Sequence, residues 1–202
     1  RFDRDNDGFE SYKYKDSNDT SLDNSITIIT EDKFGYLWLG TYDGIIRIDK
    51  ATGETKRVFS FKTNPELLQP PKVSDLYFHD DGSLWLGTVN MGFFVIQNPS
   101  NGYPLEYVQY NEEFLPAIKS ELKINKIVKT STEKLLIGTS LGLFNIAYSN
   151  KKLQLKQTSK LLEGDVLNMV EDQKGYIWAV RDHPNEKIFR FEESLNSFKA
   201  VN

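Results

Sequence analysis

The first ten residues, RFDRDNDGFE, contain the acidic pattern Asp3-x-Asp5-x-Asp7-Gly8. Alternating oxygen ligands followed by glycine begin the calcium-binding loop of an EF-hand, whose twelfth position is a bidentate glutamate. Counting from Asp3, the twelfth position is Tyr14. The same residues suit a tight turn between two β-strands, because Asp and Gly accept the backbone conformations that turns require. We interpret the pattern as a turn and predict no metal site.

Two pairs of neighbouring carboxylates, Asp80-Asp81 and Glu112-Glu113, have the residue types that glycosidases use. Glycoside hydrolysis needs two carboxyl groups on opposite sides of a cleft, one of them with a raised pKa. Adjacency in the sequence does not supply that geometry. We therefore interpret the first pair as part of an exposed turn and the second as part of a loop.

Histidine and cysteine chemistry is sparse, since the chain has two His and no Cys. The absence of Cys excludes a thiolate metal site, a disulfide and a cysteine nucleophile. With only two His, a multi-histidine metal site is disfavoured. His79 falls at the end of a strand and His183 in a loop, and neither has an evident Ser or Cys partner. We interpret both as isolated side chains and predict no catalytic residue and no cofactor.

Composition narrows the class of protein further. The 202 residues include 13% aromatic and 27% charged residues, which is typical of a folded chain. A formal net charge of -4 disfavours nucleic acid as a partner, because binding to phosphates needs an excess of Lys and Arg. No apolar run approaches the roughly 18 residues that span a bilayer, so we predict no membrane contact. Lacking an initiator Met and a signal peptide, the chain is expected to come from a longer protein.

An internal repeat dominates the sequence. Four segments align without a gap: ITIITEDKFGYLW (26–38), VSDLYFHDDGSLW (73–85), INKIVKTSTEKLL (124–136) and VLNMVEDQKGYIW (166–178). Aliphatic or other apolar residues recur at the first and fourth positions. The last position holds Trp38, Trp85, Leu136 and Trp178, spaced 47, 51 and 42 residues apart. Because the tryptophans recur at one strand position, we predict that they pack in the core rather than bind sugar.

Each copy has the pattern of four short β-strands. In the first copy we expect strands at about 26–30, 36–40, 45–49 and 56–61, separated by EDKFG, TYDG and KATGE, which supply turn residues. No window has a helical period, apart from one short turn expected within 111–122. A four-stranded unit that repeats every 42 to 51 residues is typical of a β-propeller blade. The fold class is therefore all-β.

The predicted blades occupy 26–61, 73–110, 124–158 and 166–201. Residues 1–15 match the end of the first copy, so we expect them to be the end of a preceding blade, with a strand at 9–15. Propellers avoid exposed sheet edges by closing into a ring. Four blades would leave that strand unpaired, so we expect a segment of a larger propeller, and further blades outside the chain or a homodimer to cover its edges.

The stretch SNDTSLDNSITIITEDKFGYLWLGTYDGIIRIDKATGETKRV resembles the two-component regulator propeller repeat. The residues that carry the resemblance are Ser21, Leu22, Asn24, Ile26, Glu31, Asp32, Gly35, the stretch 37–41, Gly44 and Ile45. The second and third copies keep 84–88 with Gly92 and 135–139 with Gly142. In the fourth copy AVRDHPNEK replaces the Gly-Thr turn.

The resemblance implies a function that the residues alone do not give. Propellers of this family are usually seven-bladed and form the periplasmic sensor region of hybrid two-component systems, and their ligand is typically an oligosaccharide. The histidine kinase of such a system would lie outside this chain. We therefore expect a sensor domain without catalytic residues. The alternatives are a propeller used for protein interaction or dimerisation and, from a different class, a propeller lyase.

Departures from the repeat indicate where a ligand would bind, because variable loops on a rigid scaffold commonly carry function. The loops between second and third strands and those between blades share one face of a propeller. Side chains in the former offer aromatic, donor and acceptor groups for a glycan. The candidate ligand contacts are Tyr42, Asp43, Asn90, Arg181, Asp182 and His183.

Overall fold

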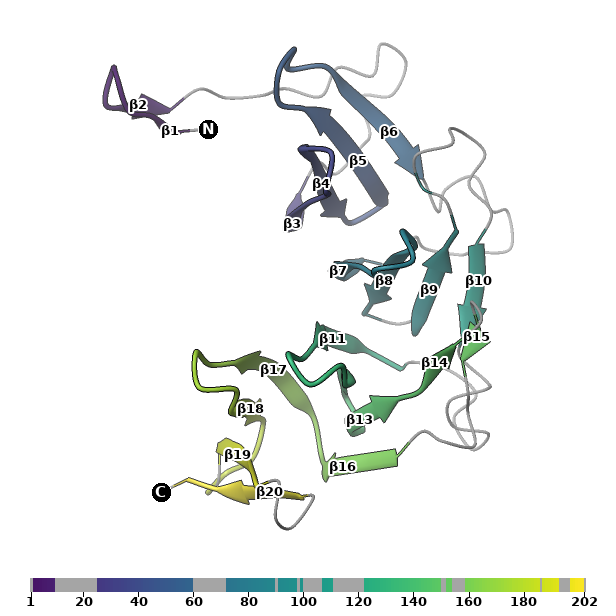
Figure 1. The fold of residues 1–202 in the computed structure, drawn as a ribbon, viewed down its shortest axis with the longest axis vertical. Coiled ribbons are helices and arrows are strands. Elements are labelled where there is room, and N and C mark those ends of the chain that lie inside the picture. Colours follow the sequence, from purple (N-terminus) through teal and green to yellow (C-terminus); the bar gives the residue numbers. More distant parts are fainter. Residues whose placement is uncertain are drawn as a thin grey trace.

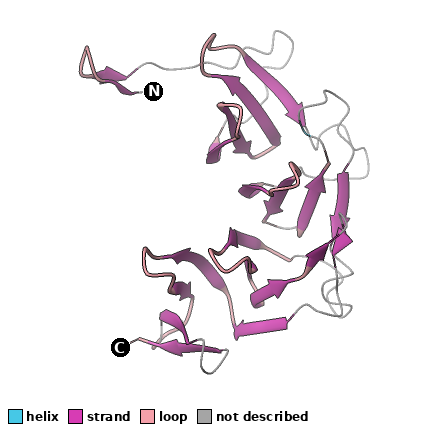
Figure 2. Ribbon diagram, viewed as in Figure 1, coloured by secondary structure: helices cyan, strands magenta, loops and turns pink. Residues whose placement is uncertain are grey.

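A computed structural model describes residues 2–9, 25–59, 72–89, 91–97, 99, 107–110, 122–149, 152–153, 159–185, 187–192 and 197–201. Across these ranges the chain is built from β-strands and turns, and no α-helix is present (Figure 2). The short helical turn expected within 111–122 lies almost wholly outside the described residues. No helix of the described ranges is long and apolar enough to cross a membrane.

Four antiparallel sheets of four strands follow one another along an arc (Figure 1). Blade 1 consists of β3 (Ile26–Glu31), β4 (Tyr36–Thr41), β5 (Gly44–Asp49) and β6 (Thr55–Phe59). Blade 2 consists of β7 (Val73–Phe78), β8 (Leu84–Thr88), β9 (Phe93–Ile96) and β10 (Tyr107–Tyr110). Blade 4 consists of β17 (Val166–Glu171), β18 (Ile177–Arg181), β19 (Ile188–Glu192) and β20 (Ser197–Ala200).

Blade 3 departs from this simple order. It contains β11 (Ile124–Lys129), β12 (Leu135–Thr139), β13 (Gly142–Ile146) and β16 (Ser159–Glu163). A separate hairpin of β14 (Tyr148–Ser149) and β15 (Lys152–Leu153) comes between β13 and β16. The outermost strand therefore falls beyond the 124–158 range expected for this blade, because the hairpin takes up the chain in between.

The sheets confirm the all-β propeller prediction, and in the described structure they do not close into a ring (Figure 1). At the start of the chain, β1 (Phe2–Asp3) and β2 (Gly8–Phe9) form a two-stranded hairpin. The acidic pattern lies in its turn, where Asp7 has a φ of 47°. Its interpretation as a turn is confirmed. Most of the strand predicted at 9–15 lies outside the described residues.

The turn between the first and second strands has the same backbone in every blade. In blade 1 the amide of Asp32 donates to the carbonyl of Tyr36, and the amide of Gly35 donates to the carbonyl of Asp32. Gly35 has a φ of 86°, which glycine adopts without steric cost. Blade 3 places Glu133 at this point with a φ of 65°, a conformation that L-residues adopt less readily. The turn geometry therefore tolerates the one copy in which the glycine is absent.

Neighbouring blades meet through their first strands. Val73 and Ile124, which begin β7 and β11, are at most 1% exposed. A Cβ on Gly40 would lie 2.5 Å from a methyl of Val73, so the blade 1 backbone leaves room for blade 2 by having no side chain there. Gly87 makes the same allowance for Ile124. A polar link accompanies the contact, since Thr27 Oγ1 donates to the carbonyl of Val73 over 2.5 Å.

The predicted tryptophan core is present. Trp38 and Trp85 are fully buried, and each belongs to a packed cluster that includes side chains of the next blade. Trp178 of blade 4 is only partly buried. The difference follows from position, because no blade covers the far side of blade 4 in the described structure.

Candidate functional site

The loop between β4 and β5 is organised from within. Thr41 Oγ1 donates to the carbonyl of Gly44 over 3.1 Å and accepts the amide of Asp43 over 3.1 Å. Asp43 is 2% exposed, and Arg57 Nη1 lies 3.0 Å from both its Oδ2 and its carbonyl oxygen. The structure therefore places Asp43 inside the loop as a partner of Arg57. Its carboxylate holds the loop in shape.

Tyr42, which precedes Asp43 in the same loop, has a more exposed side chain, at 38%. Lys72 Nζ lies 4.5 Å from the centre of its ring and donates to its hydroxyl over 3.1 Å. Lys72 directly precedes β7, so this pair joins a blade 1 loop to the connection into blade 2. An exposed ring beside a cation gives a flat apolar surface with hydrogen-bonding groups at its edge.

Blade 4 carries a longer loop between β18 and β19. Arg181 lies with its guanidinium 4.4 Å from the centre of the Phe189 ring, and its Nη1 donates to the carbonyl of Glu163 over 3.0 Å. Asp182 is exposed, and its amide donates to the carbonyl of Asp165. His183 is partly buried, and its Nδ1 accepts the amide of Asn185 over 3.4 Å. The loop therefore presents both a donor and an acceptor.

The predicted contacts divide into two groups. Tyr42 and Asp43 come from blade 1, whereas Arg181, Asp182 and His183 come from blade 4 at the other end of the arc (Figure 1). Asn90 of blade 2 lies outside the described residues. The structure thus brings together residues within each group but not across the two.

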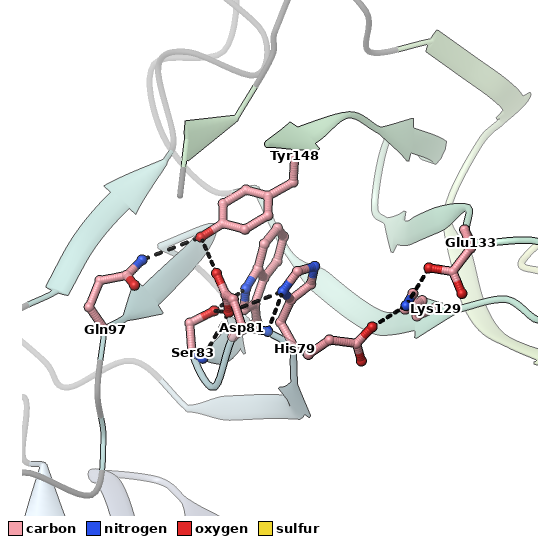
Figure 3. A network of polar contacts seen from close by, with 9 residues as sticks. His79, Asp81, Ser83, Gln97, Lys129, Glu133 and Tyr148 are labelled. Atoms are coloured by element: carbon pink, nitrogen blue, oxygen red, sulfur yellow. Dashed lines mark hydrogen bonds and ion pairs between the residues drawn. The ribbon is translucent and has the colours of Figure 1, made fainter. Parts of the chain in front are cut away.

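A second set of polar residues lies at the opposite ends of the strands, between blades 2 and 3 (Figure 3). Asp81 is its centre. The carboxylate accepts the Ser83 hydroxyl over 2.6 Å and the Tyr148 hydroxyl over 3.1 Å, and it lies 3.0 Å from His79 Nδ1. Gln97 Nε2 donates to the Tyr148 hydroxyl over 3.3 Å. The network thus links blade 2 to the small hairpin of blade 3.

Blade 2 departs from the repeat at the residues that form the network, including the position of His79. In blade 1, Asp32 Oδ2 accepts the indole N–H of Trp38 over 2.8 Å, and Asp172 does the same for Trp178 in blade 4. His79 stands at the equivalent place in blade 2. There the indole of Trp85 donates to Ser83 Oγ over 3.0 Å instead.

Aromatic packing fixes the histidine. The His79 ring is stacked on Trp85 at 5.7 Å and meets Tyr148 edge-on at 4.9 Å. The prediction that His79 is an isolated, exposed side chain is therefore wrong. The missed signal was its position in the repeat, where the two complete copies of the motif have an aspartate.

Burial and hydrogen bonding shift the pKa values of several side chains in this network. Burial alone would raise the pKa of Asp81, but hydrogen bonds from Ser83 and His79 outweigh it and hold that pKa below its usual range. Burial, assisted by the charge of Asp80, raises the pKa of Tyr77 to about 12. Burial also raises the pKa of Tyr148.

A salt bridge continues the network on its exposed side. Lys129 pairs with Asp80 and, over 2.6 Å, with Glu133 (Figure 3). Hydrogen bonds from Lys129 lower the pKa of Asp80, and those to both carboxylates raise the pKa of Lys129. The side chain of Asp80 is 69% exposed, which agrees with the exposed turn predicted for it.

The hydrogen bonds of the network hold blades 2 and 3 together, and the network lacks the features of a catalytic site. Ser83 donates to Asp81, not to His79, and is 1% exposed, so the two do not form a nucleophile and its base. Among the residues that the structure describes, no group of three His, Cys, Asp or Glu side chains could hold a metal ion. The loops with Tyr42 and Arg181 therefore remain the candidate ligand site.

Comparison with known proteins finds a family model that matches the repeat and solved structures with a similar fold. Residues 20–43 match the family model described as two component regulator propeller. No curated protein matches the chain significantly. Among solved structures, the chain is similar to one described as the extracellular domain of a hybrid two component system from B. thetaiotaomicron. That match has a TM-score of 0.72 at 20% identity and covers 98% of this chain and 24% of the other.

Two further structures extend the comparison. The extracellular domain described for a one component system of B. thetaiotaomicron has a TM-score of 0.58 at 22% identity, over 82% of this chain and 21% of the other. Virginiamycin B lyase from Staphylococcus aureus has a TM-score of 0.60 at 14% identity, over 88% of this chain and 55% of the other.

The chain thus spans about a quarter of the length of the two extracellular domains that it matches. Identities this low show the fold alone. Residues 20–43 match the model of the two component regulator propeller, and the described part of the chain forms an open arc of four β-propeller blades.

Proposed function

We propose that this chain is part of the ligand-recognition propeller of a hybrid two-component regulator, located in the periplasm, and that its ligand is an oligosaccharide. The observation that carries the proposal is the regulator repeat at 20–43, set at the start of a row of blades with the same turn and core pattern. The solved structures described as extracellular domains support a location outside the cytoplasm.

The proposed binding surface is the face that bears the loops between second and third strands. Tyr42 supplies an exposed ring on which a sugar ring can stack, and Lys72 supplies a donor at its edge. Arg181, Asp182 and His183 form a second group of contacts in blade 4, and Asn90 would add an amide from blade 2. Asp43 acts indirectly, since its bond to Arg57 positions the Tyr42 loop.

The proposed role excludes catalysis by this chain. A lyase would need a base and an acidic or metal partner placed around one substrate atom. His183 accepts a backbone amide through Nδ1, and among the described residues no group of three His, Cys, Asp or Glu side chains could hold a metal ion. Similarity to virginiamycin B lyase is at the level of the fold alone.

Calorimetry with three defined oligosaccharides tests the proposal: cellohexaose, tri-galacturonic acid and a heparin hexasaccharide. We expect saturable binding of one of them and no shorter product on chromatography of the mixture. Tyr42→Ala should weaken that binding about tenfold, or about 1.4 kcal/mol. Phe34→Ala is the matched control, because Phe34 is 66% exposed but lies in a turn at the opposite ends of the strands.

Each outcome bears on a different part of the proposal. Release of shorter sugars would overturn the sensor assignment. Absence of binding to all three would overturn the oligosaccharide assignment. An equal loss in Phe34→Ala would show that the site does not lie at Tyr42.

A second candidate function is a protein-interaction scaffold, favoured by apolar residues on the two outer blade faces. The leading face of blade 1 exposes Ile26 and Ile29, at 53% and 56%. The far face of blade 4 exposes Leu167, Val170, Val180 and Ile188. Further blades or a homodimer would cover them. Sedimentation at micromolar concentration distinguishes these cases, since a stable monomer would contradict the homodimer.

A further inference from the structure

The three covered junctions between blades share one steric pair. In each junction a glycine on the second strand of one blade faces the first residue of the next blade, which is valine or isoleucine. The pairs are Gly40 with Val73, Gly87 with Ile124 and Gly138 with Val166, where a Cβ on the glycine would lie 2.5, 2.7 and 3.1 Å from a methyl group. Protein interiors are close-packed, so the space on one blade is filled by the side chain of the other.

A hydrogen bond accompanies each pair. The second residue of each first strand donates to the carbonyl of the same valine or isoleucine in the next blade. The donors are Thr27 Oγ1, Ser74 Oγ and Asn125 Nδ2, and the bond from Asn125 is 2.8 Å long. Each covered junction of the described structure therefore combines a glycine with a polar donor.

Blade 4 changes both features on its far face. In blade 1, Gly40 pairs with Ile45 of the third strand. In blade 4, Val180 pairs with Ile188 at the same place, so valine replaces the glycine. Leu167, the second residue of β17, has no hydrogen-bond donor in its side chain. A following blade that begins with valine or isoleucine would meet the Val180 side chain, and its first carbonyl would lose its partner.

The rest of this face keeps the residues that a following blade covers. Asp172 accepts the indole N–H of Trp178 over 2.8 Å, and the Arg190 guanidinium lies 5.8 Å from the centre of the Trp178 indole and 5.1 Å from that of the Tyr176 ring. Blade 1 has the same four residue types in the same arrangement, namely Asp32, Tyr36, Trp38 and Arg47. There the tryptophan packs against blade 2 and is fully buried. This part of the blade 4 face therefore has the residues of a junction.

We propose that the far face of blade 4 binds a further four-stranded blade whose first strand begins with glycine or alanine, and that Val180 selects it. The steric pair of the covered junctions is then reversed, with the side chain on blade 4 and the space on its neighbour. A blade that begins with valine or isoleucine is excluded by overpacking. Blade 1 of a second copy is excluded for the same reason, because it begins with Ile26.

Grafting a blade onto the full chain tests the proposal. Residues 61–121, which contain blade 2, are joined after Asn202, which reproduces the length of the connection between blades 1 and 2 and supplies the blade at high effective concentration. Blade 2 is the appropriate probe, because it covers the same residue types in the first junction. One graft keeps the copied Val73, and a second graft carries Val73→Ala.

A single cysteine reports whether the face is covered. The chain has no cysteine, so Ile188→Cys places one thiol on this face, where Ile188 is 47% exposed. Its counterpart in the covered junction of blade 1, Ile45, is fully buried. With a neutral thiol reagent, the Val73→Ala graft should slow labelling at least about thirtyfold relative to the chain without a graft, because a buried thiol reacts only through local opening. The graft that keeps Val73 should leave the rate unchanged.

Variants of blade 4 assign the selection to one residue. In the chain with Val180→Gly, the graft that keeps Val73 should protect the thiol, which also shows that this graft folds. Val170→Ala shortens another exposed valine of the same face, and as the matched control it should leave that graft excluded. Equal protection by both grafts without Val180→Gly would overturn the role of Val180. If only the Val180→Gly chain is protected, the reversed pair is wrong, and if no graft protects any chain, the face does not take a blade.

Discussion

The junctions between blades are covered, whereas the outer faces of blades 1 and 4 are not, and equivalent strand positions differ in exposure between the two kinds of face. The first residue of β7, β11 or β17 is at most 1% exposed, whereas Ile26, at the start of β3, is 53% exposed. Ile26 keeps the residue type of the covered positions. The face of blade 1 therefore has the chemistry of a junction without the neighbour.

Blade 4 differs in chemistry as well as in exposure. Where blade 1 has Thr27, which bonds to the next blade, blade 4 has Leu167. Where blade 1 has Gly40, blade 4 has Val180, which is 38% exposed. A following blade packed like the others would meet the Val180 side chain. The comparison teaches that the two outer faces are not equivalent, and that only the blade 1 face is shaped for standard packing.

The largest expected effect comes from the tryptophans. Trp38→Ala should lower the free energy of unfolding by about 3–5 kcal/mol, because it removes a fully buried ring from a covered junction. Trp178→Ala should cost less, since that ring is partly exposed although its indole makes the same 2.8 Å bond to an aspartate. Urea unfolding of both variants measures the difference, and equal losses would contradict the distinction between covered and open faces.

Next in size is the glycine at the junction. Gly40→Ala should destabilise the protein by about 1–3 kcal/mol, because the added Cβ would lie 2.5 Å from methyl groups of Ile28 and Val73. Val180→Ala is the control at the same repeat position, and it should change the free energy of unfolding by less than about 1 kcal/mol. A neutral Gly40→Ala would show that the blades are not packed this closely.

The hydroxyl link between blades should contribute less. Thr27→Val removes a donor to the carbonyl groups of Gly40 and Val73, and we expect a loss of about 1 kcal/mol. Leu167→Thr introduces the same hydroxyl on the open face, where the described structure offers no following blade to accept it. A stability gain in Leu167→Thr as large as the loss in Thr27→Val would argue against the interblade role of the bond.

The smallest expected effect is a pH dependence within the junction of blades 2 and 3. Asp75 is 1% exposed, and its carboxylate accepts Lys126 Nζ over 3.0 Å and the amide of Ile127 over 2.7 Å. Burial nevertheless raises its pKa above the ordinary value of 3.8. A raised pKa in the folded state means that protonation stabilises the fold, so this contribution is present below pH 3.8 and is lost as the pH rises through the folded pKa.

Comparison with Asp75→Asn isolates this contribution from those of other carboxylates. The amide cannot ionise, so the cost of the substitution in free energy of unfolding should become smaller between pH 4 and pH 8. Chemical denaturation at both pH values measures it. A cost that grows with pH would mean that pairing with Lys126 outweighs burial.

Most of the architecture could be predicted from the sequence, because the same strand and turn pattern occurs in four copies. Strand pattern, turn glycines and the burial of Trp38 and Trp85 all follow from positions that recur. The prediction holds even at Glu133, where the turn has the same geometry although the glycine is absent. The hairpin of Tyr148 and the late position of β16 were not predicted, because they occur in one blade and break the period.

The candidate site was less predictable for the same reason. Tyr42 and Asp43 were both predicted as ligand contacts, yet Asp43 is buried against Arg57, fourteen residues further along the chain. His79 lies beside Asp81 of its own turn, but its aromatic partners are Trp85 on β8 and Tyr148 of the next blade. Contacts of this kind depend on tertiary packing, which spacing in one sequence does not report.

Thiol labelling tests the central claim, that blades pack through their first strands and that blade 1 has an open junction face. The chain has no cysteine, so Ile26→Cys and Val73→Cys each introduce a single thiol at the same repeat position. With a neutral thiol reagent we predict that Ile26→Cys reacts at least about a hundredfold faster, because a buried position reacts only through local opening. Equal rates at the two positions would contradict the account.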